Sequence, residues 1–250
     1  MSDHKTGKWA KQILDSRDIK GMWGNFHTLS QPVGNKAITT EQSLRRLRIL
    51  GFTKDDEPIR RVLDKMCLCV SGRKKIDNYY EKTYDWALFE KLMLSAWIRI
   101  FEPENEIALG VAKQWGKIVG KSFSSGQYNR NDDIAAFTSQ FGRKPKSGFE
   151  TGFGMFYHAA LLNGILSPAT ENLLLQYYLT RSDGIYYIYD KSLNVLPDVF
   201  ASKRTSQYLA AIELLAGYGQ ARGKLGFVAE WLDSHKDKYG QVSGGATWNC

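Results

Sequence analysis

The sequence has little of what marks a secreted, membrane-spanning or disulfide-bonded protein. Its three cysteines in 250 residues are an odd number and do not make a disulfide framework. No apolar run reaches the roughly 18 residues that a membrane-spanning helix needs. The first residues, MSDHKTGKWAKQ, are polar and lack the apolar stretch of a signal peptide. These absences predict a soluble, reduced, cytoplasmic protein.

Strand signals are also scarce. The best candidate, GIYYIYD at residues 184–190, is short and equally compatible with an extended turn. Helical periodicity dominates the rest of the chain. Ile59, Val62, Met66 and Val70, for example, follow the three- and four-residue spacing of one buried helix face. The pattern predicts an all-α protein.

Glycine-rich turns recur along the chain at near-equal intervals. Their glycines are separated by 51, 54, 58 and 56 residues and are Gly21, Gly72, Gly126, Gly184 and Gly240. Each turn follows a predicted helix that is itself preceded by a short Gly- or Pro-containing link. Such a period indicates an internal repeat of helical hairpins. We expect about four hairpins plus one extra helix near residues 7–18, in a single domain of residues 1–250.

One of these turns carries a spacing that resembles a known motif. Trp231, Leu232, Lys236, Gly240 and Val242 are spaced as in the QW motif of squalene and terpene cyclases, with Lys in place of the usual Gln and Val in place of the usual Trp. A shorter version, LDSRDIKGMW at residues 14–23, keeps the Trp. The repeats therefore resemble the superfamily of squalene cyclases, terpene cyclases and protein prenyltransferases.

This resemblance implies an α/α toroid, in which the first helix of each hairpin surrounds a central cavity. It also implies a small apolar, isoprenoid-like ligand bound by aromatic walls. Four hairpins and one extra helix do not make a full ring, because the Gly-rich tail SGGATWNC does not fit a final inner helix. We expect a ring that is incomplete, tightly closed or completed by a second copy in a homodimer.

The acid motif of these cyclases, Asp-x-Asp-Asp, is absent from the sequence. The weak candidates for catalytic carboxylates are Asp132 and Asp133, in an expected loop over residues 129–148, together with Asp85 and Glu150. A carbohydrate-active lyase or hydrolase, which also uses helical barrels, needs two carboxylates facing one site, and Asp85 with Glu150 is the only pair to nominate. The acidic stretch Lys54–Glu57 is interpreted as a helix start.

Candidate ligand-binding residues are mostly aromatic and lie where inner helices are expected to begin. They are Trp86, Phe89, Phe153, Tyr157, His158, Arg204 and Tyr208. Aromatic walls with few polar groups suit an apolar or sugar-like ligand, although the same rings could fill the core. Cys67, Cys69 and Asp64 do not complete a zinc site, and the sequence predicts no metal and no cofactor.

The net charge of +8 is concentrated in one segment. Between residues 44 and 75, ten Lys and Arg face four Asp and Glu, an excess of six. A basic cluster can attract nucleic acid or an acidic protein, and it can equally be a solvated helix face. The third functional hypothesis is therefore a non-enzymatic interaction module that uses residues 44–75.

Overall fold

The computed structural model describes residues 4–27, 38–76, 85–146 and 149–236, with only the backbone given for Phe153. This part of the chain contains ten α-helices and two 3-10 helices and no strand, which confirms the all-α class. The chain divides into two compact units, Met1–Val111 and Ala112–Cys250. The single domain and the toroidal arrangement of the hairpins stay predictions.

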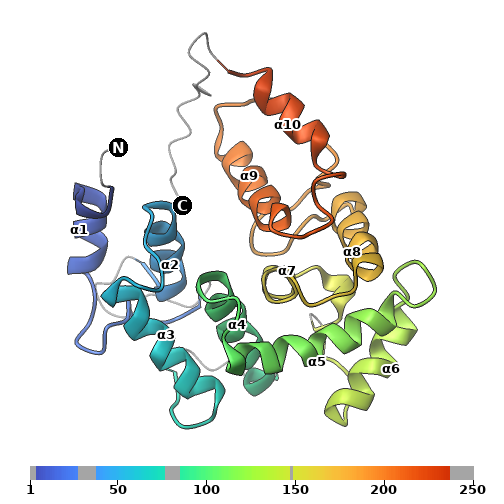
Figure 1. Ribbon diagram of the computed structural model, residues 1–250, viewed down its shortest axis with the longest axis horizontal. Helices are drawn as coiled ribbons and strands as arrows, with labels where there is room; N and C mark the ends of the chain where they lie inside the picture. The colour runs from blue at the N-terminus through green and yellow to red at the C-terminus, as the bar shows by residue number, and fades with distance from the viewer. Residues whose placement is uncertain (1–3, 28–37, 77–84, 147–148, 237–250) are drawn as a thin grey trace. The chain divides into compact units, whose positions relative to one another are not determined.

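Figure 1 shows the helices of the two units in chain order. In the first unit they are η1 (His4–Thr6), α1 (Lys8–Asp15), α2 (Thr40–Ile49), α3 (Glu57–Val70), α4 (Trp86–Phe101) and the start of α5 (Glu106–Ser122). In the second unit α5 is followed by α6 (Arg130–Phe141), η2 (Thr151–Phe153), α7 (Phe156–Leu161), α8 (Pro168–Thr180), α9 (Lys203–Ala216) and α10 (Gly226–Asp233).

The helix starts follow from local capping chemistry. Thr39 and Gln42 form a reciprocal capping box at α2, and the Ser167 hydroxyl accepts a hydrogen bond from the backbone of α8. The expected start of α3 after Lys54–Glu57 is confirmed. Its cap detail differs, because the Asp56 carboxylate accepts hydrogen bonds from Thr53 instead of from the backbone of α3.

The repeated glycine turns share one backbone conformation. Gly21, Gly72, Gly126 and Gly184 have φ values of 77°, 75°, 86° and 60°, in the left-handed region that side chains with a Cβ rarely occupy. The predicted turns are confirmed at these four glycines. Gly240 lies outside the described residues.

The expected loop over residues 129–148 is wrong, because α6 occupies most of it. Asn129 caps this helix by accepting hydrogen bonds from the backbone of Asn131 and Asp132, and Gly142 ends it with φ 70°. A cap, two acidic residues in the first turn and a terminal glycine are all helix signals. The interpretation as a loop missed them because the helix is weakly amphipathic.

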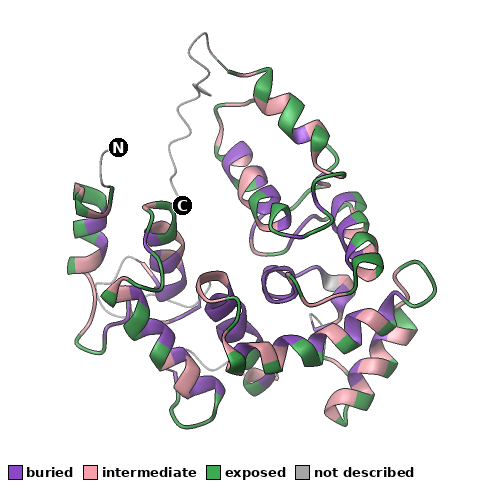
Figure 2. Cartoon of the chain, in the orientation of Figure 1, coloured by how far each residue is buried: buried purple, intermediate pink, exposed green. Residues whose placement is uncertain are grey.

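Helix α7 is the most enclosed element of the second unit. All six of its residues are buried, and it appears entirely in the buried colour in Figure 2. It packs against α9, and α5 contacts it through Trp115 and His158. In the first unit the corresponding contact joins α3 to α4, where the predicted face of Ile59, Val62, Met66 and Val70 is buried.

Candidate functional site

The segment 184–190, here called the tyrosine turn, is a tight turn attached to the start of α7. Tyr186 donates its backbone N–H to Gly154, and Phe156 donates to Tyr186, at 3.0 and 3.1 Å. Ile185 and Tyr189 exchange two backbone hydrogen bonds of 2.9 and 3.0 Å. The segment forms isolated bridges and no strand, so its interpretation as an extended turn is the correct one.

Backbone strain is concentrated in this turn. Tyr187 has φ 77° and is the one residue other than glycine with positive φ in the described part of the chain. Such a conformation costs on the order of 1–3 kcal/mol and persists only where the surroundings hold it. Here two rings do so, since Tyr187 lies 5.5 Å from Tyr157 of α7 and 4.2 Å from Tyr186, centroid to centroid.

The other end of the turn is held by α9. The ring of Tyr189 meets the ring of Tyr208 edge-on at 5.5 Å, and the Tyr208 hydroxyl donates to the carbonyl of Leu193 at 3.0 Å. Arg204 lies over the ring of Tyr189 at 5.5 Å and donates to Asp190 at 3.0 Å. The turn therefore brings together three of the predicted ligand residues, Tyr157, Tyr208 and Arg204.

These residues divide by exposure into a buried base and an open surface. Tyr157 and Tyr208 are almost fully buried, and burial raises the pKa of Tyr208. Tyr186 is 43% exposed, and the side chains of Arg204 and Asp190 are 42% and 89% exposed. The turn thus exposes an aromatic ring at Tyr186 and, on its α9 side, a guanidinium and a carboxylate. Tyr186, Tyr187 and Asp190 are not among the residues predicted from the sequence, although the aromatic run after Gly184 is a visible signal.

His158 lies on α7 next to Tyr157 but contacts α5. It is fully buried, and its ring lies 4.5 Å from the ring of Trp115. Both of its nitrogens and Nε1 of Trp115 have no hydrogen-bond partner among the described residues. Burial lowers the pKa of His158 to about 3, so the imidazole is neutral near pH 7. It is not placed to act as a proton donor to a molecule at the surface.

Asp133 is buried inside a hydrogen-bond network and not solvated in a loop. Its carboxylate accepts from the Tyr128 hydroxyl and the Thr151 backbone, both at 2.8 Å, and from the Thr151 hydroxyl at 3.2 Å. Burial raises the pKa of Asp133, although these hydrogen bonds oppose the rise. Through these hydrogen bonds the Asp133 carboxylate joins α6 to η2, the element that precedes α7.

The remaining predicted carboxylates are Asp132, Glu150 and Asp85, and two of them have structural partners. Asp132 lies half-buried in the first turn of α6. Glu150 pairs with Arg130 at 3.3 Å. Asp85, in the first unit, caps α4 through the backbone N–H of Leu88. Asp85 and Glu150 belong to different units, so neither unit contains the pair that a glycosidic reaction would need.

Two predicted aromatic residues also lie in the first unit. Trp86 and Phe89 are 5.5 Å apart on α4, and Phe89 meets His27 edge-on at 5.3 Å. The side chain of Phe153 lies outside the described part of the chain. Three of the seven predicted ligand residues therefore meet at the tyrosine turn. His158 follows one of them, Tyr157, on α7.

Within the described residues, no group of three or more His, Cys, Asp or Glu side chains could hold a metal ion. No described helix is long and apolar enough to cross a membrane. Comparisons with protein-family models, curated proteins and solved structures find no significant match to the chain.

Proposed function

We propose that the second unit binds a small, largely apolar, isoprenoid-like molecule at the tyrosine turn and does not carry out acid-initiated cyclisation. The carrying observation is the accessible ring of Tyr186, which lies 4.2 Å from the ring of the strained Tyr187. It belongs to the turn that Arg204 of α9 contacts through Tyr189 and Asp190. Strained backbone persists only where tertiary contacts hold it, and it is often found at binding sites.

The chemistry of the turn suits a ligand with an apolar body and one anionic or hydroxyl group. Aromatic faces favour contact with hydrocarbon chains and rings. Arg204 can donate charge-assisted hydrogen bonds to a phosphate or carboxylate, and it can do so while its guanidinium stays over Tyr189. The proposal assigns binding to this turn and gives Asp133 a structural role.

The test is a titration of the full chain with farnesol and with farnesyl diphosphate, followed by tyrosine and tryptophan fluorescence or calorimetry. Tyr186→Ala should weaken the binding of both ligands by roughly 3- to 10-fold, because a ring contact contributes about 0.5–1.5 kcal/mol. Arg204→Gln should weaken the binding of farnesyl diphosphate by roughly 10-fold or more and leave the affinity for farnesol nearly unchanged.

Val195→Ala is a control for these variants, because Val195 is an exposed apolar residue of the same α8–α9 connection. It should leave both affinities unchanged. Absence of binding of either ligand to the wild-type protein would overturn the proposal. Binding of a neutral oligosaccharide in their place, lost in Tyr186→Ala, would support the sugar-binding alternative.

A further inference from the structure

The first unit exposes three large apolar side chains in a region that is otherwise polar. Trp9 is 68% exposed, Ile19 is 96% exposed and Ile49 is 50% exposed. Helix α1 packs through Ala10 and Ile13, which are buried, and Trp9 lies at the edge of that packed face. Isolated exposed apolar residues are common, but a tryptophan and two isoleucines on one small unit indicate an interaction surface.

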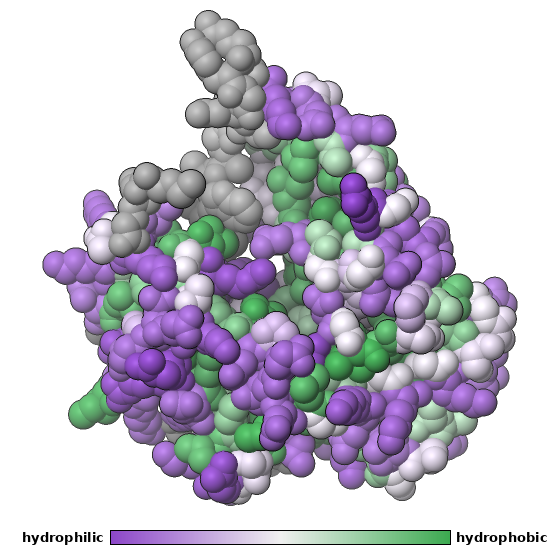
Figure 3. Space-filling view, viewed as in Figure 1, coloured by the Kyte–Doolittle hydropathy of each residue, from purple (hydrophilic) through white to green (hydrophobic). Residues whose placement is uncertain are grey.

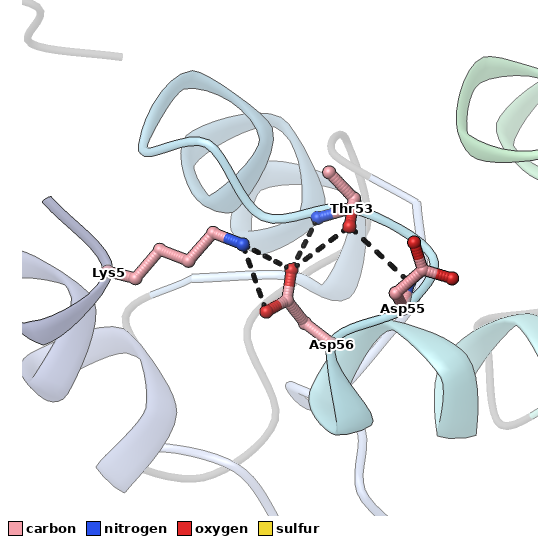
Figure 4. Close-up of polar contacts among 4 residues, drawn as sticks. All are labelled: Lys5, Thr53, Asp55 and Asp56. Carbon is pink, nitrogen blue, oxygen red and sulfur yellow. Dashed lines mark hydrogen bonds and ion pairs between the residues drawn. The ribbon is translucent and has the colours of Figure 1, made fainter. Parts of the chain in front are cut away.

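These residues belong to one piece of structure. Lys5 donates to both carboxylate oxygens of Asp56 at 2.8 and 3.0 Å, and Figure 4 shows this pair joining η1 to the link before α3. Arg17 pairs with Glu57 at 3.4 Å, and the two helices α1 and α2 are in direct contact. We call residues 4–20 with residues 48–61 the N-terminal surface.

The N-terminal surface carries a positive excess. It contains nine Lys and Arg against five Asp and Glu, an excess of four. Lys8 and Lys11, which flank Trp9 on α1, are both exposed. In Figure 3 this part of the chain shows mostly hydrophilic side chains with separate hydrophobic groups among them. This combination suits an anionic partner that also accepts apolar side chains.

We propose that the N-terminal surface binds peripherally to an anionic lipid bilayer. Lysines near such a surface are attracted to anionic headgroups. Tryptophan and aliphatic side chains insert at the boundary between headgroups and acyl chains. Nucleic acid would use the lysines and could stack on Trp9, but it offers nothing to isoleucines as exposed as Ile19. This inference is independent of the ligand proposed for the second unit.

The experiment is co-sedimentation of the full chain with vesicles of phosphatidylcholine alone and of phosphatidylcholine with roughly a quarter phosphatidylserine. The wild-type protein should bind the anionic vesicles, more weakly as salt is added. Lys8→Gln with Lys11→Gln should weaken binding roughly 25-fold, since each basic residue near the surface contributes about fivefold. Trp9→Ala with Ile19→Ala should weaken it by roughly 10-fold or more.

Val195→Ala with Val199→Ala is the matched control, because both valines are exposed aliphatic residues of the second unit. It should bind vesicles like the wild type, and circular dichroism should show that all variants are folded. The proposal is overturned if the wild type does not bind anionic vesicles. It is overturned as well if the control loses as much vesicle binding as the variants of the N-terminal surface. It is also overturned if Trp9→Ala with Ile19→Ala binds normally. In that last case, salt-sensitive binding to an oligonucleotide would identify nucleic acid as the partner.

Discussion

Two short helices, α1 in the first unit and α7 in the second, show opposite uses of apolar residues. Helix α1 has eight residues and buries Ala10 and Ile13, while Trp9 faces solvent. Helix α7 has six residues and buries all of them, including a histidine. A helix too short to be stable alone depends on tertiary packing. Packing therefore accounts for the burial of α7, whereas in α1 it leaves Trp9 exposed.

The substitution with the largest expected effect on stability replaces the tryptophan that packs on α7. Trp115→Ala removes a fully buried ring that contacts Phe137, Phe141 and His158. We expect the free energy of unfolding to fall by about 3–5 kcal/mol, as for other large-to-small core changes. Urea unfolding monitored by circular dichroism measures it. A loss below about 1 kcal/mol would show that α7 is not held by this contact.

The histidine of α7 gives a pH-dependent test. The folded protein keeps His158 neutral down to a pKa of about 3, whereas its ordinary value is 6.5. Below pH 6.5 the unfolded chain therefore binds a proton that the folded chain does not, and stability falls as the pH falls towards 3. This contribution is fully present above pH 6.5.

His158→Phe removes that contribution and keeps an aromatic ring at the same buried position. At pH 7 we expect unchanged stability or a gain of about 1 kcal/mol, because polar atoms without partners are removed. Urea midpoints measured from pH 7 to pH 4 should fall less steeply in this variant than in the wild type. Parallel pH profiles would mean that His158 has a hydrogen-bond partner that stabilises its charged form.

The smallest expected effect on stability is that of Trp9→Ala. An exposed side chain contributes little to folding, so the free energy of unfolding should change by no more than about 0.5 kcal/mol. Thermal and urea unfolding check this value. A loss of several kcal/mol would place Trp9 in a core and would remove the basis of the lipid-binding inference.

Local sequence signals predicted the all-α class, the start of α3 after Lys54–Glu57 and the glycine turns. The signals before α3 and the glycine at Gly184 act over a few residues, so their effects could be predicted without tertiary information. Helix α6 was missed because Asn129 and the acids after it also suit a loop. The burial of Asp133 depends on Thr151, 18 residues away, and no local pattern indicates such a contact.

The candidate site was predictable in composition but not in arrangement. The aromatic run after Gly184 was visible, and Tyr157, Tyr208 and Arg204 were predicted ligand residues. The turn at which they meet contains Tyr187 with a positive φ, which side chains rarely adopt and which no local pattern indicates. The exposure of Trp9 was also unpredictable, since periodicity indicates a helix face and does not say which residues its neighbours cover.

Native mass spectrometry of the purified full chain, followed by denaturation to release bound molecules, tests the central claim most directly. We expect a small apolar molecule to accompany the wild type and Trp9→Ala in equal amounts and Tyr186→Ala in a clearly smaller amount. A protein free of any bound molecule, or an equal amount bound to Tyr186→Ala, would contradict ligand binding at the tyrosine turn.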